Sequence, residues 1–531
     1  MLARFPGYQL LFVLLVSFVS LANGPKSVAA ERPNILFIYT DDQSHRTVSC
    51  YPEAYDWVRT PNIDRLAADG VRFSNAYIGS WCMPSRATLL TGHHQHGIES
   101  MRMEGPYPGS AYDPEKCPFW PNLFRKNGYQ TAQIGKWHTG VDTGFGRDWD
   151  FQVVWNRPAH PKNAPNYYDN QLISKNGGEP KMTTGYTTDN YTDWAIDYIK
   201  GQERDADKPW YLWLCYGAVH GPFTPAERHL DDYQGITIPI PQDIYPPRAG
   251  KPDYAQKMEF WEPGPNGAGP VERQVRKVSP VGMKDRPGRP LIEWVRQYQQ
   301  GVLAIDESVG RLLETLQASG QDDNTLIVFT SDQGFAWGQH GSKSKVSPYN
   351  HTVQSPLIIR PPKNRATAGK AAAVSGHVVK APVSGVDLPP TFFAQAGIEL
   401  PWKMHGHDLS PLLESKQAEW PHPAMLVHTA KQYGSNTAKV PPAGDPRLTH
   451  GPGVPWYVSY SRGDFKYIRT LVAGEVEELY NIRNDPNELT NLATNKANIE
   501  QLLKYRADAI EELRRTDAAM VDNLPPVKVI E

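Results

Sequence analysis

"PNILFIYTDDQ", residues 33–43, is a short apolar run that stops abruptly at two carboxylates, Asp41 and Asp42. This pattern is typical of a buried parallel strand that ends in a loop. The stretch "NTLIVFTSDQG", residues 324–334, repeats the design, with Asp332 and Gln333 after the apolar run. We therefore expect two neighbouring strands that both end in acidic loops.

Other segments alternate between strand-like and helical patterns. Apolar runs that break at polar residues, Gly or Pro occupy 129–138, 209–223 and 355–362, and helical periodicity marks 60–73, 121–129, 191–201 and 302–320. Such alternation predicts an α/β fold, with a large, mostly parallel sheet sandwiched by helices. Ligands bind such sheets beyond the carboxyl ends of the strands.

The two ends of the chain differ from this central part. Arg4, the apolar run 10–22 and the small residues 28–30 predict a signal peptide over residues 1–30, because the apolar core is shorter than the roughly 20 residues of a membrane span. A retained signal anchor is the alternative. No later segment is apolar enough to cross a bilayer, so we expect a secreted or periplasmic protein with no membrane association after cleavage.

Beyond the signal peptide, the pattern predicts a large α/β domain over 31–415 and a smaller C-terminal α+β domain over 416–531. The second domain is expected to hold an antiparallel sheet followed by a helix over 498–516. A segment rich in Pro, Gly and charge, 236–289, interrupts the first domain. It is either a passive connection or a loop that lines the substrate site.

Charge and cysteine content narrow the class of protein. A net charge of −2 argues against a nucleic-acid partner, which usually requires a basic stripe. The chain has four cysteines, too few and too scattered for a disulfide framework in a chain this long, so we expect one disulfide or none. They are Cys50, Cys82, Cys117 and Cys215.

Asp41, Asp42, Asp332 and Gln333 are candidate metal ligands, because the ends of parallel strands meet at one edge of a sheet. Hard oxygen donors with no close thiolate or histidine pair suit Ca²⁺ or Mg²⁺ and not zinc. The alternative is that Asp41 and Asp42 only cap a turn.

"WCMPSRATLLTG", residues 81–92, places Cys82 before Pro84 at the expected start of a helix that ends near Gly92. Free N–H groups and the helix dipole favour an anion at such a position, and Arg86 adds a charge one turn on. A buried structural cysteine or half of a disulfide remains the alternative for Cys82.

The motif C-x-P-S-R followed by "LLTG" resembles the signature of the type I sulfatases, within the alkaline-phosphatase superfamily. The resemblance runs over 33–492 and includes "TPNIDRLAADGVRFSNAY", "GYQTAQIGKWH" and "ELYNIRNDPNELTNLA". It implies an alkaline-phosphatase-like fold. It also implies that a maturation enzyme reads C-x-P-x-R and oxidises Cys82 to formylglycine, whose hydrate attacks sulfur with one hydroxyl and expels sulfate with the other.

The resemblance also implies roles for individual residues. The ligands of one Ca²⁺ would be Asp41, Asp42, Asp332, Gln333 and the modified Cys82. Arg86, Lys136 and Lys345 would surround the sulfate. His138 would bond to the hydrated aldehyde or assist its collapse, and His220 would protonate the leaving alcohol.

Four residues depart from the family pattern. Met83 follows the cysteine where a small residue is usual, and Gln333 stands where Asn or His is commoner. Asn350 and Gln354 replace the usual Glu and Arg in the segment that carries Lys345.

The leading hypothesis is a sulfatase that acts on a sulfated carbohydrate through formylglycine and Ca²⁺. Aromatic residues, as in "GFGRDWDFQVVWNRP" (144–158), either stack on sugar rings or belong to the core. The alternatives are a phosphonate monoester or phosphodiester hydrolase of the same superfamily and a non-catalytic binder of sulfated glycans. Neither the sugar nor the sulfated position follows from the sequence.

Overall fold

The computed structural model describes residues 1–2, 32–99, 101–102, 111–273, 288–366 and 374–528. Apart from its first two residues, the expected signal peptide lies outside this part of the chain. In the described part, no helix has both the length and the apolar character needed to cross a membrane.

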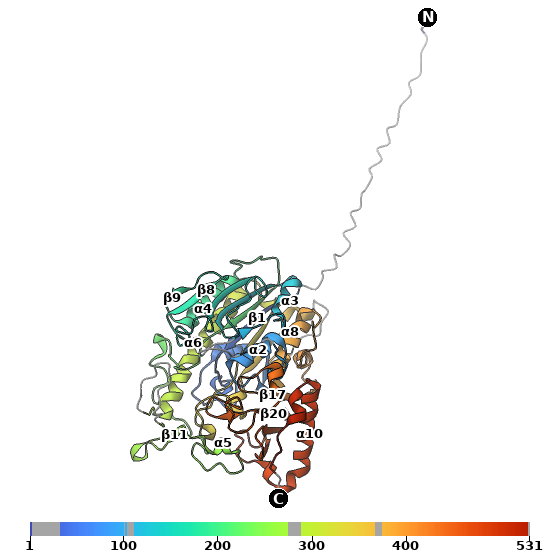
Figure 1. The fold of residues 1–531 in the computed structure, drawn as a ribbon. Helices are drawn as coiled ribbons and strands as arrows, with labels where there is room; N and C mark the ends of the chain where they lie inside the picture. Colours follow the sequence, from blue (N-terminus) through green and yellow to red (C-terminus); the bar gives the residue numbers. More distant parts are fainter. Residues whose placement is uncertain (3–31, 100, 103–110, 274–287, 367–373, 529–531) are drawn as a thin grey trace.

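A mixed sheet of ten strands forms the centre of the described chain (Figure 1). Its central strands, β13, β1, β10, β6 and β7, are parallel neighbours, and the outer strands are mostly antiparallel. The predicted fold class is confirmed. In spatial order the strands are β15 (His377–Val379), β2 (Val71–Phe73), β14 (Leu357–Arg360), β13 (Thr325–Ser331), β1 (Asn34–Thr40), β10 (Trp210–Cys215), β6 (Gln130–Trp137), β7 (Phe151–Asn156), β8 (Gln171–Lys175) and β9 (Lys181–Thr183).

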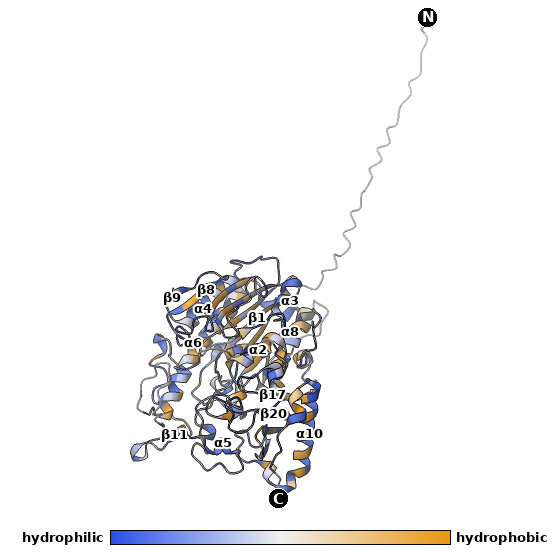
Figure 2. Ribbon diagram, viewed as in Figure 1, coloured by the Kyte–Doolittle hydropathy of each residue, from blue (hydrophilic) through white to orange (hydrophobic). Residues whose placement is uncertain are grey.

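Helices cover both faces of this sheet because its strands are apolar on both sides (Figure 2). Phe37 of β1 faces one core with α2, α3 and α8, and Ile38 faces the other with α1, α4 and α6. The helices are α1 (Pro61–Asp69), α2 (Cys82–Thr91), α3 (Pro121–Lys126), α4 (Thr187–Ile199), α5 (Asp253–Gln256), α6 (Leu291–Ala318), α7 (Asn350–Val353), α8 (Leu388–Ala396), α9 (Ser410–Glu414) and α10 (Ile499–Arg515).

The C-terminal part forms the expected antiparallel sheet, below β1 in Figure 1, with α10 beside it. Its four strands, in order, are β17 (Ala424–His428), β20 (Tyr457–Arg462), β21 (Phe465–Thr470) and β22 (Glu477–Asn481). The remaining strands form short pairs: β3 (Ala76–Tyr77) with β16 (Val383–Ser384), β4 (Met101–Arg102) with β5 (Ala111–Tyr112), β11 (Trp261–Glu262) with β12 (Val271–Glu272), and β18 (Thr449–His450) with β19 (Val454–Pro455).

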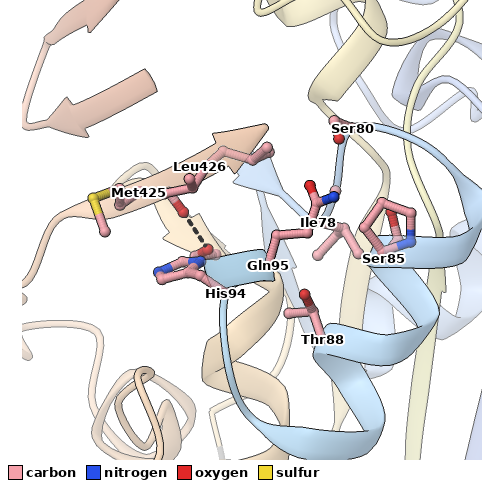
Figure 3. A pocket seen from close by; sticks show the side chains of 12 residues that line it. Ile78, Ser80, Ser85, Thr88, His94, Gln95, Met425 and Leu426 are labelled. Carbon is pink, nitrogen blue, oxygen red and sulfur yellow. Dashed lines mark hydrogen bonds between the residues drawn. The ribbon is translucent and has the colours of Figure 1, made fainter. Parts of the chain in front are cut away.

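Strand β17 lies across a small cavity from α2, the helix that carries Cys82. Figure 3 shows Ser85 and Thr88 of α2 facing Met425 and Leu426 of β17 across a cavity of about 20 Å³, which is room for a single water. The Gln95 side chain fixes the contact, because it donates to the Ala430 carbonyl at 3.0 Å and accepts the Thr429 N–H at 3.2 Å. The residues that follow β17 are therefore hydrogen-bonded to the segment that follows α2.

Candidate active site

The acidic residues converge as predicted at the carboxyl edge of the sheet. Because β1 and β13 are parallel and pair Thr40 with Ser331, the residues that follow lie side by side. The Asp42 N–H donates to Asp332 Oδ1 at 2.9 Å. Carboxylate oxygens of Asp41, Asp42 and Asp332 lie within 4.8 Å of one another, and all three side chains are buried.

The electrostatics of these carboxylates favour a bound cation. Burial alone would raise the pKa of Asp41, but nearby cations, above all Lys136, hold it well below its ordinary value. Burial and the Asp41 carboxylate raise the pKa of Asp332 to about 8, and burial also raises that of Asp42. A divalent cation among them would stabilise the ionised forms.

Gln333 is the fourth candidate ligand and is fully buried. Its Nε2 donates to Asp42 Oδ1, while its Oε1 has no hydrogen-bond partner among the described residues. Turning the amide by 180° presents Oε1 to the carboxylates, which is the orientation a cation requires. The donor set of three carboxylates and one amide therefore fits a hard cation such as Ca²⁺.

Cys82 begins helix α2, and the helix ends at Gly92 in the left-handed conformation (φ 74°), as predicted. Its Sγ lies 3.3 Å from Asp41 Oδ1 and 2.9 Å from Lys345 Nζ. Burial and Asp41 raise the pKa of the Cys82 thiol to about 12, so an unmodified thiol stays protonated and is a weak nucleophile. None of the four cysteines, all of which lie in the described part of the chain, forms a disulfide.

Two buried cations lie beneath the carboxylates. The Arg86 guanidinium is 3.3 Å from Asp332 Oδ2 and 3.8 Å from Asp41 Oδ2. Lys136, near the end of β6, forms an ion pair with Asp41 Oδ2. Both side chains have no exposed surface, so their charges are fixed in place and only weakly screened.

Lys345 reaches the site from the segment between β13 and α7. Its Nζ donates to Asp42 Oδ1 at 2.6 Å. The next residue, Val346, donates its N–H to the Ser80 carbonyl at 3.1 Å and accepts the Tyr457 hydroxyl at 2.9 Å. The segment is thus held between the start of α2 and the C-terminal sheet. Asn350 and Gln354 bind Lys466 and the Ser74 carbonyl, so they serve this packing.

His220 follows β10 and faces the carboxylates. Its Nδ1 lies 2.8 Å from the Gly221 carbonyl and must donate to it, so Nε2 carries the lone pair, 3.6 Å from Asp42 Oδ2. The ring stacks on Tyr167 with centroids 4.0 Å apart. Burial and the Lys345 ammonium lower the pKa of His220 well below its ordinary value.

His138 contacts a residue that the sequence pattern did not single out as a site residue. The Arg157 guanidinium lies 3.3 Å from His138 Nδ1 and stacks over the Tyr167 ring at 4.9 Å. Burial and this guanidinium lower the pKa of His138 well below its ordinary value, so the imidazole is neutral. Arg157 follows β7 directly, and this strand-end position is the only signal in the sequence that points to it.

The aromatic residues of 144–158 divide between core and surface. Trp149 and Trp155 are fully buried, so the interpretation as core residues holds and stacking on sugar rings is wrong for both.

At the start of α2, the Trp81 ring lies 4.2 Å from that of His450, in the β18–β19 hairpin. The C-terminal part therefore contributes a side chain beside Cys82.

The family model described as Sulfatase matches residues 33–398. This chain belongs to the sulfatase family. The sulfatase is 29% identical over 568 residues to the N-acetylglucosamine-6-O-sulfatase of Bacteroides thetaiotaomicron, with 98% of this chain and 93% of that protein covered.

Solved structures agree with this assignment. The sulfatase superposes on BT4656 in complex with its substrate D-glucosamine-2-N,6-O-disulfate with a TM-score of 0.73 and 27% identity, covering 92% of this chain and 98% of the other. The phosphonate monoester hydrolase of Agrobacterium radiobacter gives 0.65 and 21% identity, covering 91% and 96%, and shows a shared fold alone. The protein is a sulfuric ester hydrolase.

Proposed function

We propose that this sulfatase removes the 6-O-sulfate from N-acetylglucosamine or glucosamine units of sulfated glycans. The proposal is supported by the relative that carries this activity and covers nearly the whole chain, and by the structural neighbour that holds a 6-O-sulfated glucosamine. The observation that carries the sulfatase chemistry in this proposal is the buried Cys82 at the start of α2, between the carboxylates and Lys345.

The nucleophile is formylglycine made from Cys82. A buried thiol with a pKa of about 12 does not attack a sulfate ester at neutral pH. Cys82, Pro84 and Arg86 match the C-x-P-x-R motif that the maturation enzyme reads. Met83 packs fully buried in the core, so its departure from the family pattern follows from packing. The aldehyde hydrate supplies a nucleophilic hydroxyl and a second hydroxyl that allows sulfate to leave.

Asp41, Asp42, Asp332 and the Oε1 of Gln333 would hold one Ca²⁺, with the modified residue 82 as a further ligand. The cation would supply positive charge where the sulfuryl oxygens and the attacking hydroxyl gather negative charge. Before it binds, three carboxylates face the three cations Arg86, Lys136 and Lys345. With Ca²⁺ held there, the site would carry an excess of two positive charges, which would favour binding of the anionic sulfate ester.

The remaining side chains orient sulfate and move protons. Lys345 Nζ, 2.9 Å from the position of the nucleophile, binds a sulfuryl oxygen. Arg157 holds the neutral His138, which accepts a proton as sulfate departs. A bound sulfate ester adds negative charge that favours protonation of His220 at Nε2. His220 then gives this proton to the leaving alcohol, and Tyr167 fixes the plane of its ring.

His220→Gln should separate leaving groups. We expect a loss of about 10²- to 10³-fold in kcat on a sugar sulfate, because the alkoxide leaves poorly without a proton. The loss should be under about tenfold on 4-nitrophenyl sulfate, whose phenolate leaves unaided. His96→Gln, at a buried histidine near the end of α2, is the matched control. Equal losses on both substrates would assign His220 to sulfate binding instead of proton transfer.

The test of the proposed function is sulfate release, followed by ion chromatography, from N-acetylglucosamine 6-sulfate and its 3-sulfate isomer. We expect turnover of the 6-sulfate at least tenfold above that of the 3-sulfate. If the protein hydrolysed 4-nitrophenyl sulfate but neither sugar sulfate, the proposed substrate would be refuted and the sulfatase activity would still be supported. A preference above about tenfold, roughly 1.4 kcal/mol in barrier, for an aryl phosphodiester would favour the phosphonate or phosphodiester hydrolase alternative.

Two further parts of the proposal need their own tests. A chain released from a secreting host and beginning near Glu31 would support export and cleavage of the signal peptide, whereas a retained N-terminus would support a signal anchor. Glycan binding that survives Cys82→Ala, with no sulfate released by fully matured wild type, would support the non-catalytic binder.

A further inference from the structure

A second group of metal-ligating side chains lies apart from the catalytic carboxylates. His340, His351 and Glu488 each offer one ligand atom, and these atoms lie within 4.8 Å of one another. The three residues are 4%, 5% and 0% exposed. They come from the loop after β13, from α7 and from the turn after β22, so the sheet-edge loops and the C-terminal part meet here.

Each histidine uses one ring nitrogen in a polar contact and keeps the other available for a metal. His340 Nδ1 lies 2.5 Å from Asp243 Oδ2, and His351 Nε2 lies 3.3 Å from Asn487 Oδ1. The other nitrogens, His340 Nε2 and His351 Nδ1, are buried and have no hydrogen-bond partner among the described residues. A histidine ligand bound to a carboxylate or amide through its second nitrogen is the usual support of a protein metal site.

Glu488 keeps ligand capacity although it is already held. Its Oε2 accepts the Asn350 N–H at 2.6 Å, and its Oε1 lies 2.8 Å from Lys466 Nζ. An ionised carboxylate has about four lone-pair positions, so a metal and a lysine can share it. Lys466 also donates to Asn350 Oδ1 at 2.9 Å and stays anchored if the carboxylate turns toward a metal.

We propose that His340, His351 and Glu488 form a second metal site, for a divalent transition metal of the zinc class. Two imidazoles and a carboxylate suit zinc, whereas the three catalytic carboxylates and Gln333 offer oxygen and amide donors, which suit Ca²⁺. Zinc ligands 2.0–2.2 Å from the ion lie at most about 4.4 Å apart, which small side-chain rotations reach. The two histidines flank Lys345 in the sequence, so the metal clamps the segment that delivers this lysine to the active site.

Cobalt is the probe, because its visible absorption reports nitrogen ligands. Protein stripped with a chelator and refilled with Ca²⁺ should take up one Co²⁺ per chain, and Zn²⁺ should displace it. Asp41, Cys82 and His220 form another group of possible ligands. The titration is therefore repeated in Cys82→Ala, where the cobalt spectrum should persist.

His351→Gln and Glu488→Gln should each weaken cobalt binding at least about 100-fold, and Asp243→Asn about 10- to 100-fold. His96→Gln should bind as wild type does. Circular dichroism of each variant shows whether it folds. Where a variant does not fold, the number of cobalt ions bound per wild-type chain decides whether the site exists. Calcium-filled wild type that binds neither cobalt nor zinc would overturn the site, as would a folded His351→Gln with unchanged affinity. In that case Glu488 serves its ion pair with Lys466 and binds no metal.

Discussion

Cys82→Ser is expected to lower steady-state kcat on a sulfate ester by at least about 10⁴-fold, because turnover needs a second hydroxyl that serine lacks. Its single hydroxyl, at the start of α2 beside Asp41 and Lys345, can still attack sulfur. The alcohol then leaves with a proton, and sulfate stays bound to serine as a stable ester. Intact-protein mass spectrometry after incubation with substrate should show one added sulfate group per chain.

Cys82→Ala is the companion variant and should be equally inactive, but without added sulfate. Cys50→Ser, at a half-buried cysteine in the loop before α1, should keep wild-type turnover. If Cys82→Ser retained more than about a tenth of wild-type kcat, the second hydroxyl would be dispensable. The formylglycine mechanism would then be excluded.

Asp42→Asn should lower both calcium content and turnover. Three carboxylates lie within 4.8 Å of one another. The substitution removes one metal ligand and the negative charge that forms an ion pair with Lys345. We expect calcium, measured by elemental analysis, to fall from one ion per chain to below about a tenth. Turnover should fall about 10²- to 10³-fold.

Asp150→Asn is the matched control, because its carboxylate pairs with Arg125 at the opposite end of the sheet. It should keep calcium and activity. Chelation of wild type should reproduce the Asp42→Asn loss, and added Ca²⁺ should restore wild type alone. Full activity of wild type after its calcium is gone would contradict the proposed metal role.

The group of carboxylates at the carboxyl edge of the sheet was predictable because the ends of buried strands can be recognised in the sequence. An apolar run that stops at Asp41 or Asp332 predicts both the strand and its end, and parallel pairing then brings the two loops together. Cys82 and Arg86 were predictable as neighbours in the site because Pro84 marks the start of a helix and the two residues are one turn apart. Lys345 and His220 depended on the resemblance to the sulfatases, since single Lys and His residues in loops carry no pattern.

Long-range contacts escaped prediction. Arg157 and Tyr167 are aligned only because the chain after β7 folds back over the loop that follows β10. Helix α6 begins at Leu291, well before the expected residue 302, because Gly301 is a poor helix former and interrupts the helical pattern in the sequence. A Cβ at that position would come 3.3 Å from Val219, so the glycine permits close packing beside the site.

The second metal site was beyond sequence reasoning for the same cause. His340 and His351 are near in sequence, but Asp243 lies in the proline-rich segment and Glu488 in the C-terminal part. The described part of this segment, 236–273, is anchored to the loop after β13, because Asp243 accepts hydrogen bonds from the N–H and the ring of His340. No local spacing relates these four residues.

The mass of the proteolytic peptide that contains residue 82 is the most direct test of formylglycine-dependent sulfatase chemistry. The protein should be secreted from a host with an aerobic maturation enzyme. We predict a peptide in which the thiol is replaced by an aldehyde oxygen, in proportion to specific activity across preparations. Full activity in a preparation whose peptide keeps the intact thiol would contradict the mechanism.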